Sequence, residues 1–92
     1  KASAPSDAQA EREADKEAQR KVKELQRRQQ ELEKRIEELE AQKKSLEDQF
    51  LDPALVQRPD KMRTLSSQLS PVKDELEARF AKWQELEERK GA

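Results

Sequence analysis

The stretch "FLDPALVQRPDKM", residues 50–62, decides the fold, because it places two prolines close together between long segments that hold few helix breakers. Pro53 and Pro59 each follow a residue that is disfavoured from helix, and each suits the first turn of a new helix. Two such signals this close together predict a reversal of the chain rather than a kink. We therefore expect a turn over residues 52–59, with "DPALV" as one helical turn capped by Asp52.

Before this stretch, apolar residues recur at spacings of three, four and seven, which is the heptad pattern of a coiled coil. They are Val22, Leu25, Leu32, Ile36, Leu39, Leu46 and Phe50. The residues between them are nearly all Glu, Lys, Arg and Gln, which are good helix formers. The pattern predicts a first helix over about residues 10–51.

The same spacing resumes after the turn and predicts a second helix over about residues 60–89. Its apolar residues are Met62, Leu65, Leu69, Val72, Leu76, Trp83 and Leu86. Pro71 falls inside this helix, where a proline removes a hydrogen bond and clashes with the preceding turn. We expect a kink or a short break over residues 69–71, with the apolar pattern continuing across it.

Folding the second helix back on the first aligns the two apolar stripes, for example when Leu39 lies beside Leu76. The predicted fold class is all-α, an antiparallel two-helix coiled-coil hairpin, and we expect a monomer. Gln29 occupies a seam position, where a polar residue fixes the register of the two helices at some cost in stability. Phe80 lies next to the seam and is expected to pack there with Trp83.

Composition argues against a catalytic domain. With 32% apolar and 45% charged residues, a chain of 92 residues has too little apolar surface for a globular core with a pocket. Histidine and cysteine are absent and the single glycine is Gly91, which excludes a Ser-His-Asp arrangement, His- or thiolate-ligated metal and a glycine-rich phosphate loop. The sequence contains no apolar run long enough to predict a membrane span. We expect no catalytic, cofactor-binding or metal-binding residue, and we predict that this chain is not an enzyme.

Positive charge is concentrated in two regions, residues 20–28 and residues 53–73, although the formal net charge of the whole chain is -1. The basic residues of these regions are Arg20, Lys21, Lys23, Arg27, Arg28, Arg58, Lys61, Arg63 and Lys73. Basic side chains about a helical turn apart can follow a phosphate backbone. We take these residues as a candidate nucleic-acid-binding site. The alternative is a structural or protein-partner coiled coil on which they are ordinary solvated residues.

The first residues, "KASAPSDAQA", are mostly small or polar and contain Pro5, a composition typical of a linker. The chain begins with Lys1 rather than methionine, which predicts that it is part of a longer protein. We therefore expect a flexible linker over residues 1–10 and the coiled-coil domain over residues 11–91.

Three segments together resemble the C-terminal coiled-coil domain of ABC-F ATPases of the Uup type. They are "LEDQFLDPALV", "RPDKMRTLSSQL" and "ELEARFAKWQELEE", which hold the aspartate-proline turn and the ending Leu76, Phe80, Trp83 and Leu86. The resemblance implies a cytoplasmic bacterial protein whose cassettes, elsewhere in a longer chain, bind ATP and Mg and hydrolyse the ATP. It also implies that the hairpin contributes binding to nucleic acid, which is DNA for Uup-type members and ribosomal RNA for the wider family.

Overall fold

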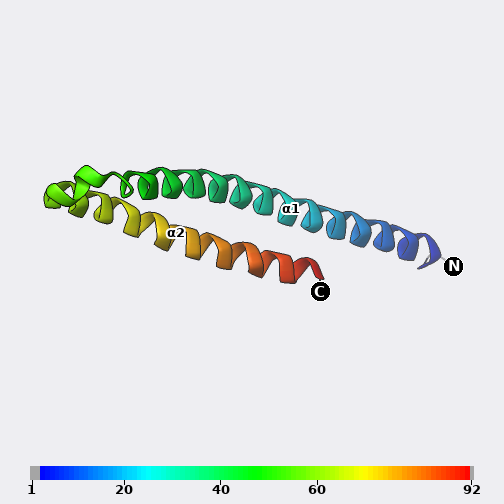
Figure 1. Ribbon diagram of the computed structural model, residues 1–92. Helices are drawn as coiled ribbons and strands as arrows, with labels where there is room; N and C mark the ends of the chain where they lie inside the picture. The colour runs from blue at the N-terminus through cyan, green and yellow to red at the C-terminus, as the bar shows by residue number, and fades with distance from the viewer. Residues whose placement is uncertain (1–2, 92) are drawn as a thin grey trace.

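Two long antiparallel helices joined by a short turn make up the part of the chain that the computed structural model describes, residues 3–91, with side chains from residue 8 onward. Helix α1 spans Ser3–Gln49, the 3-10 helix η1 spans Pro53–Gln57, and α2 spans Pro59–Gly91. Figure 1 shows α1 and α2 side by side, with the turn at one end and both ends of the chain toward the other. The molecule measures 86 × 17 × 14 Å. The predicted all-α hairpin is confirmed.

The turn forms as its prolines predict. An Asp52 carboxylate oxygen accepts a hydrogen bond of 3.0 Å from the backbone N–H of Ala54, which caps η1. Arg58 then has a non-helical backbone, with φ -131° and ψ 75°, and Pro59 is the first residue of α2. The two X-Pro steps therefore end one helical segment and begin the next within a few residues.

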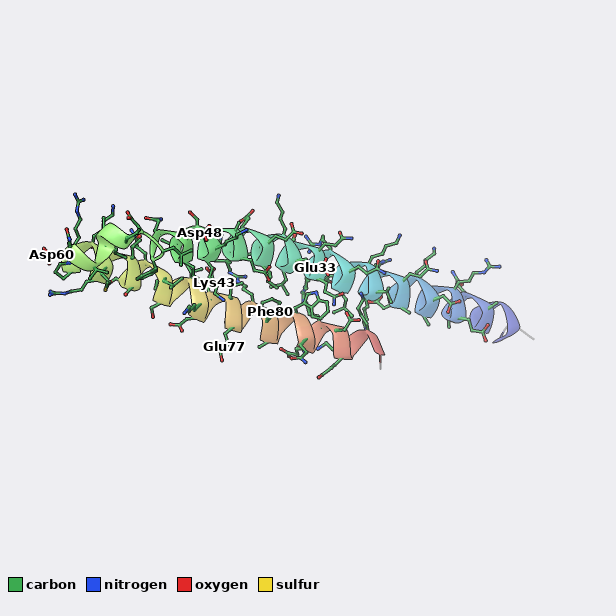
Figure 2. The ribbon with its side chains drawn as sticks, viewed as in Figure 1. Glu33, Lys43, Asp48, Asp60, Glu77 and Phe80 are labelled. Atoms are coloured by element: carbon green, nitrogen blue, oxygen red, sulfur yellow. The ribbon has the colours of Figure 1, made fainter. Side chains whose placement is uncertain are left out.

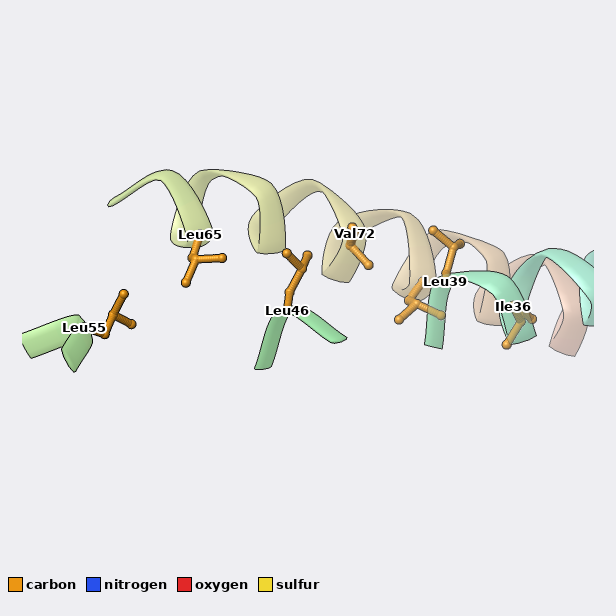
Figure 3. Packing of buried hydrophobic residues seen from close by; sticks show 7 residues of the cluster. Ile36, Leu39, Leu46, Leu55, Leu65 and Val72 are labelled. Atoms are coloured by element: carbon orange, nitrogen blue, oxygen red, sulfur yellow. The ribbon is translucent and has the colours of Figure 1, made fainter. Parts of the chain in front are cut away.

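The core is a single layer of apolar side chains between the helices (Figure 3). Its buried members are Ile36, Leu39, Leu46, Leu55, Leu65, Val72 and Leu76, and Phe50, Leu69 and Trp83 pack against them partly buried. Leu32 and Leu86 are buried nearer the open end of the hairpin. This is the seam that the heptads predict, with two differences at the turn. Leu55 lies outside the heptad pattern and closes the seam under the turn, and Met62, expected in the seam, is 38% exposed, because α1 ends before it can cover that position.

Helix α1 begins earlier than the sequence led us to expect. It starts at Ser3 rather than at about residue 10, so residues 3–10 are helical, and residues 1 and 2 lie outside the described part. The physical reason is that Pro5 falls in the first turn, where a backbone N–H has no partner within the helix. The following Ala and Glu residues then favour helix. That residues 1–10 act as a linker between domains stays a prediction.

Helix α2 runs without interruption through Pro71, so a break over residues 69–71 is wrong, whereas a kink there stays a prediction. Proline at this position removes one hydrogen bond, to the carbonyl of Ser67. Both residues are exposed, so water can bind the freed carbonyl and the helix need not end there. The apolar phase is retained, because Leu65 and Val72 on either side are both buried.

The two helices differ in length, and α1 extends past the end of α2. We call residues 3–24 of α1 the overhang; every described side chain in it, from residue 8 to residue 24, is exposed. The overhang is about 33 Å long at 1.5 Å per residue. Val22 is 50% exposed, so the expectation that it lies in the seam is wrong, because α2 ends before it can cover that position. None of the described helices is long and apolar enough to pass through a membrane.

Candidate nucleic-acid interface

The first group of basic residues lies where the overhang joins the paired part of the hairpin. We call it the stem cluster: Arg20, Lys21, Lys23, Arg27 and Arg28. All five are exposed. Arg27 lies 3.7 Å from Glu31, and Arg28 lies 2.8 Å from Glu24, whereas the other three make no ion pair within residues 8–91.

The spacing of the stem cluster decides which way its charges point. Arg20, Lys23 and Arg27 are three and four residues apart and therefore share one face of α1. Lys21 and Arg28 are seven apart and share a different face. Arg20, Lys21 and Lys23 lie on the overhang, where α2 does not lie beside α1, so a phosphate backbone can approach either face there. Arg28 lies in the paired part and lines a groove with Arg79 and Lys82 of α2.

The second group lies at the turn, and we call it the tip cluster: Arg58, Lys61 and Arg63. Arg58 is the C-cap of η1, and the other two lie near the start of α2. All three are exposed and make no ion pair within the described part of the chain. Asp52 and Asp60 lie in the same region, so the tip cluster has a weaker net field than the stem cluster.

Lys73 belongs to neither cluster, because it lies further along α2 on the flank of the hairpin. It lines a groove with Lys43 and Lys44 of α1, together with Glu47 and Asp48. The two α1 lysines were not among the candidates predicted from sequence. Only the antiparallel register, which brings these parts of the two helices together, could have shown that they lie beside Lys73.

The two clusters are separated by a distance that is meaningful for a duplex. From residue 24 to residue 50, α1 rises about 39 Å, and one turn of B-DNA rises about 34 to 36 Å. A straight duplex lying along the hairpin therefore needs a little more than one helical turn to reach both clusters.

Not every basic residue is available to a ligand. Arg35 of α1 forms a cross-helix ion pair with Glu75 of α2, at 3.0 Å, and also lies 3.3 Å from Glu38. Arg79 approaches Glu75 at 3.4 Å. The hydrogen bond from Arg35 lowers the pKa of the Glu75 carboxyl below its usual range, and the same bond raises the pKa of Arg35. These arginines stabilise one flank of the hairpin and are poor candidates for phosphate contacts.

The polar residue predicted in the seam is found there. Gln29 is 3% exposed; its amide nitrogen donates to a carboxylate oxygen of Glu87, and its amide oxygen accepts a hydrogen bond of 2.5 Å from Lys90 Nζ. A buried amide with both of its polar atoms bonded fixes the register of two helices. The end of α2 is thereby held beside α1 close to the stem cluster.

The aromatic side chains do not both lie in the seam. Trp83 is partly buried, and its indole N–H donates a hydrogen bond of 3.0 Å to Glu33. Phe80 is 47% exposed, so the expectation that it packs in the seam is wrong. It lies one position away from the heptad and so faces the side of the hairpin. Both rings border a groove lined with carboxylates, which would repel a phosphate backbone, so the structure does not favour base stacking on them.

Sequence reasoning also missed two apolar side chains at the tip. Leu51 and Val56 are 78% and 77% exposed beside the tip cluster. Neither fits the heptad pattern, and that mismatch is the signal that could have identified them. Across the described part of the chain, no group of three or more His, Cys, Asp or Glu residues is placed to hold a metal ion.

Comparison with known protein families gives a match over most of the chain. A family model described as ABC transporter C-terminal domain matches residues 20–88, which span both arms of the hairpin, the turn and all the candidate basic residues. No curated protein and no solved structure matches the chain.

Proposed function

The chain belongs to the ABC transporter C-terminal domain family, and from this premise we propose that it is the accessory hairpin of an ABC-F type ATPase and binds nucleic acid through phosphate contacts. The observation that carries the proposal is the stem cluster: its five basic side chains are exposed, and three of them, Arg20, Lys21 and Lys23, lie on the overhang, which α2 leaves uncovered. ATP and Mg bind to cassettes outside this chain, in the cytoplasm. The hairpin itself takes no part in the ATPase chemistry.

Binding of this kind follows from charge and geometry. Lysine and arginine side chains that neutralise phosphates release counterions, so affinity falls steeply as salt increases. Contacts to phosphates position a protein without reading the bases. The hairpin therefore binds duplex DNA or ribosomal RNA weakly by itself and without sequence preference. The tip cluster enters a groove or reaches folded RNA, and the stem cluster follows the backbone nearer the linker.

The decisive experiment reverses charge in matched pairs along one helix. In Arg20→Glu/Lys23→Glu, two exposed stem-cluster residues change sign. In the control, Arg12→Glu/Lys16→Glu, the change in net charge is the same, also on exposed overhang residues, but outside the cluster. Affinity is measured by fluorescence anisotropy with duplex DNA, single-stranded DNA and structured RNA, starting from about 50 mM salt.

The stem variant should bind at least about 10-fold more weakly than the control, and its salt slope should flatten by about 1 for each lost phosphate contact. Reversing Arg58, Lys61 and Arg63 at the tip should weaken binding across all sequences in the same way. A duplex of about 8 base pairs is shorter than one helical turn and cannot reach both clusters. Reversal of the tip charges should therefore reduce its affinity less than that of a duplex of about 24 base pairs. The proposal is wrong if all three nucleic acids fail to bind, or if the stem and tip variants bind as the parent does.

A second function, a coiled coil that binds a protein partner, is favoured by a different surface. Phe80 lines a carboxylate-rich groove and is 47% exposed within the described part of the chain. This surface shares no residue with the stem and tip clusters.

A further inference from the structure

The two flanks of the hairpin are built differently. One flank is bridged by the ion pair of Arg35 with Glu75, which Arg79 also approaches, and the grooves on this flank include these arginines in their lining. The other flank forms a groove between α1 and α2 that no ion pair crosses within residues 8–91. The part nearer the open end of the hairpin is lined by Glu33, Ile36, Glu37, Glu40, Phe80 and Trp83. The groove continues toward the tip past Glu40 and Phe80, which also line the next part.

Figure 2 shows Phe80 between the two ribbons in this view, with Glu33 and Lys43 labelled along α1 and Glu77 pointing away from α1. The floor of the groove is apolar, because Ile36 and the two aromatic rings form it. Trp83 is held in place by its hydrogen bond of 3.0 Å to Glu33, so the site has a fixed shape rather than one that a ligand must induce.

The wall of this groove is acidic and its charge is not balanced. Glu33, Glu37 and Glu40 are four and three residues apart and so lie on one face of α1. None of them forms an ion pair within residues 8–91, although eight other ion pairs are present there. No basic residue lines this part of the groove, and the three carboxylates are not placed to hold a metal ion.

We propose that this groove is a docking site for a basic amphipathic helix of a protein partner. An apolar side chain of that helix covers Phe80 and Trp83, and lysine or arginine residues next to it pair with the three carboxylates. A cationic side chain over either ring gains a further cation–π contact. The helix lies along the hairpin in the manner of helix-in-groove recognition.

The dimensions of the groove fit this occupant. Its acidic part runs from Glu33 to Glu40 along α1, about 10 Å or two helical turns. The next part, where Lys43, Lys44 and Lys73 join the carboxylates, extends it to Asp48, about 22 Å in all, which is the length of a helix of about 15 residues. The basic residues of the partner helix therefore lie at the end nearer Glu33. Such a contact is smaller than a standard stable interface, so the complex is transient, with a dissociation constant in the micromolar range. Nucleic acid is a poor occupant, since its phosphates would face three carboxylates.

The test uses two synthetic helices of about 15 residues with leucine at every third or fourth position. The other positions are lysine in one peptide and glutamate in the second. Trp83 is the only tryptophan of the chain and lines the groove, so its fluorescence reports occupancy directly. Anisotropy of a dye on the peptide gives a second readout that does not depend on Trp83.

Two groove variants are compared with a matched control. Glu37→Lys/Glu40→Lys reverses two carboxylates of the groove, and Glu77→Lys/Glu88→Lys makes the same change in charge at exposed positions outside it. The groove pair should weaken binding of the lysine peptide at least about 10-fold and the control pair less than about 3-fold. Phe80→Ala, which truncates the half-exposed anchor, should weaken it about 30-fold. The circular dichroism spectrum of the Phe80→Ala variant should match that of the parent, which shows that the hairpin is still folded.

The proposal is wrong if the lysine peptide fails to bind at about 1 mM, or if the glutamate peptide binds equally well. Equal loss of binding in the groove and control pairs would also overturn it, because attraction to the whole acidic surface would then explain the binding. Phe80→Ala should leave affinity for duplex DNA and structured RNA unchanged. If it weakens them instead, the groove belongs to the nucleic-acid site and no protein helix occupies it. The two functions can therefore fail separately.

Discussion

Leu39 offers the sharpest test of the hairpin core, because it is 1% exposed and lies within the seam on α1. Leu39→Ala removes about three carbon atoms at about 0.8 kcal/mol each and leaves a cavity that a single-layer core closes only in part. We expect a loss of about 3 kcal/mol in the free energy of unfolding. For a chain of this size total stability is about 5 to 14 kcal/mol. The midpoint of thermal unfolding should fall by about 12 to 24 °C.

The matched control is Leu51→Ala, the same truncation at a side chain that is 78% exposed at the tip. It should change the free energy of unfolding by no more than about 0.5 kcal/mol. During urea denaturation, far-UV circular dichroism measures the loss of helix, and the fluorescence of Trp83 measures the opening of the seam. If Leu39→Ala and Leu51→Ala unfold at the same urea concentration, the two helices do not pack through this seam and the assignment of the core fails.

Three further predictions concern single contacts. Pro71→Ala should stabilise the chain by about 1 to 3 kcal/mol, because it restores the hydrogen bond to the Ser67 carbonyl; an unchanged urea midpoint would show that the proline costs nothing there. Glu75→Gln should lower the melting temperature more at neutral pH than at pH 2. The pKa of Glu75 is lowered in the folded state by Arg35, so its contribution is present above the ordinary carboxyl pKa of about 4.3 and is lost as pH falls through the lowered value. If the variant melts below the parent by the same number of degrees at both pH values, the Glu75 carboxylate does not stabilise the fold through its charge. Gln29→Leu should raise the urea midpoint but allow the two helices to pair in more than one register. The chain has no cysteine, so pairs of cysteines can be introduced where alternative registers would bring them together, and additional disulfide crosslinks would detect those registers.

Most of the fold could be predicted from sequence because its determinants are local. The heptad spacing fixes which face of each helix is apolar, and Pro53 and Pro59 fix where the chain reverses. Once both stripes are known, few alignments bury both, and Gln29 restricts the choice further. The buried positions Leu39 and Leu76 follow directly from this reasoning.

The features that could not be predicted depend on the second helix. Val22 fits the heptad as well as Leu32 does, and only the position at which α2 ends shows that it is exposed. Phe80 departs from the heptad by one residue, which places it on a flank, but its acidic neighbours come from α1. The candidate basic residues could be identified by charge alone, whereas the position of Lys73 beside Lys43 and Lys44 depends on the register.

The overhang of α1 also has a mechanical consequence. The paired part of the hairpin is about as long as α2, about 50 Å, and two packed helices resist bending more than one helix does. Flexure should therefore concentrate at the step where α2 ends and the hairpin is reduced to a single helix. There the pair acts as a lever, and a rotation of about 10° carries the turn through about 9 Å, most of the width of the DNA major groove.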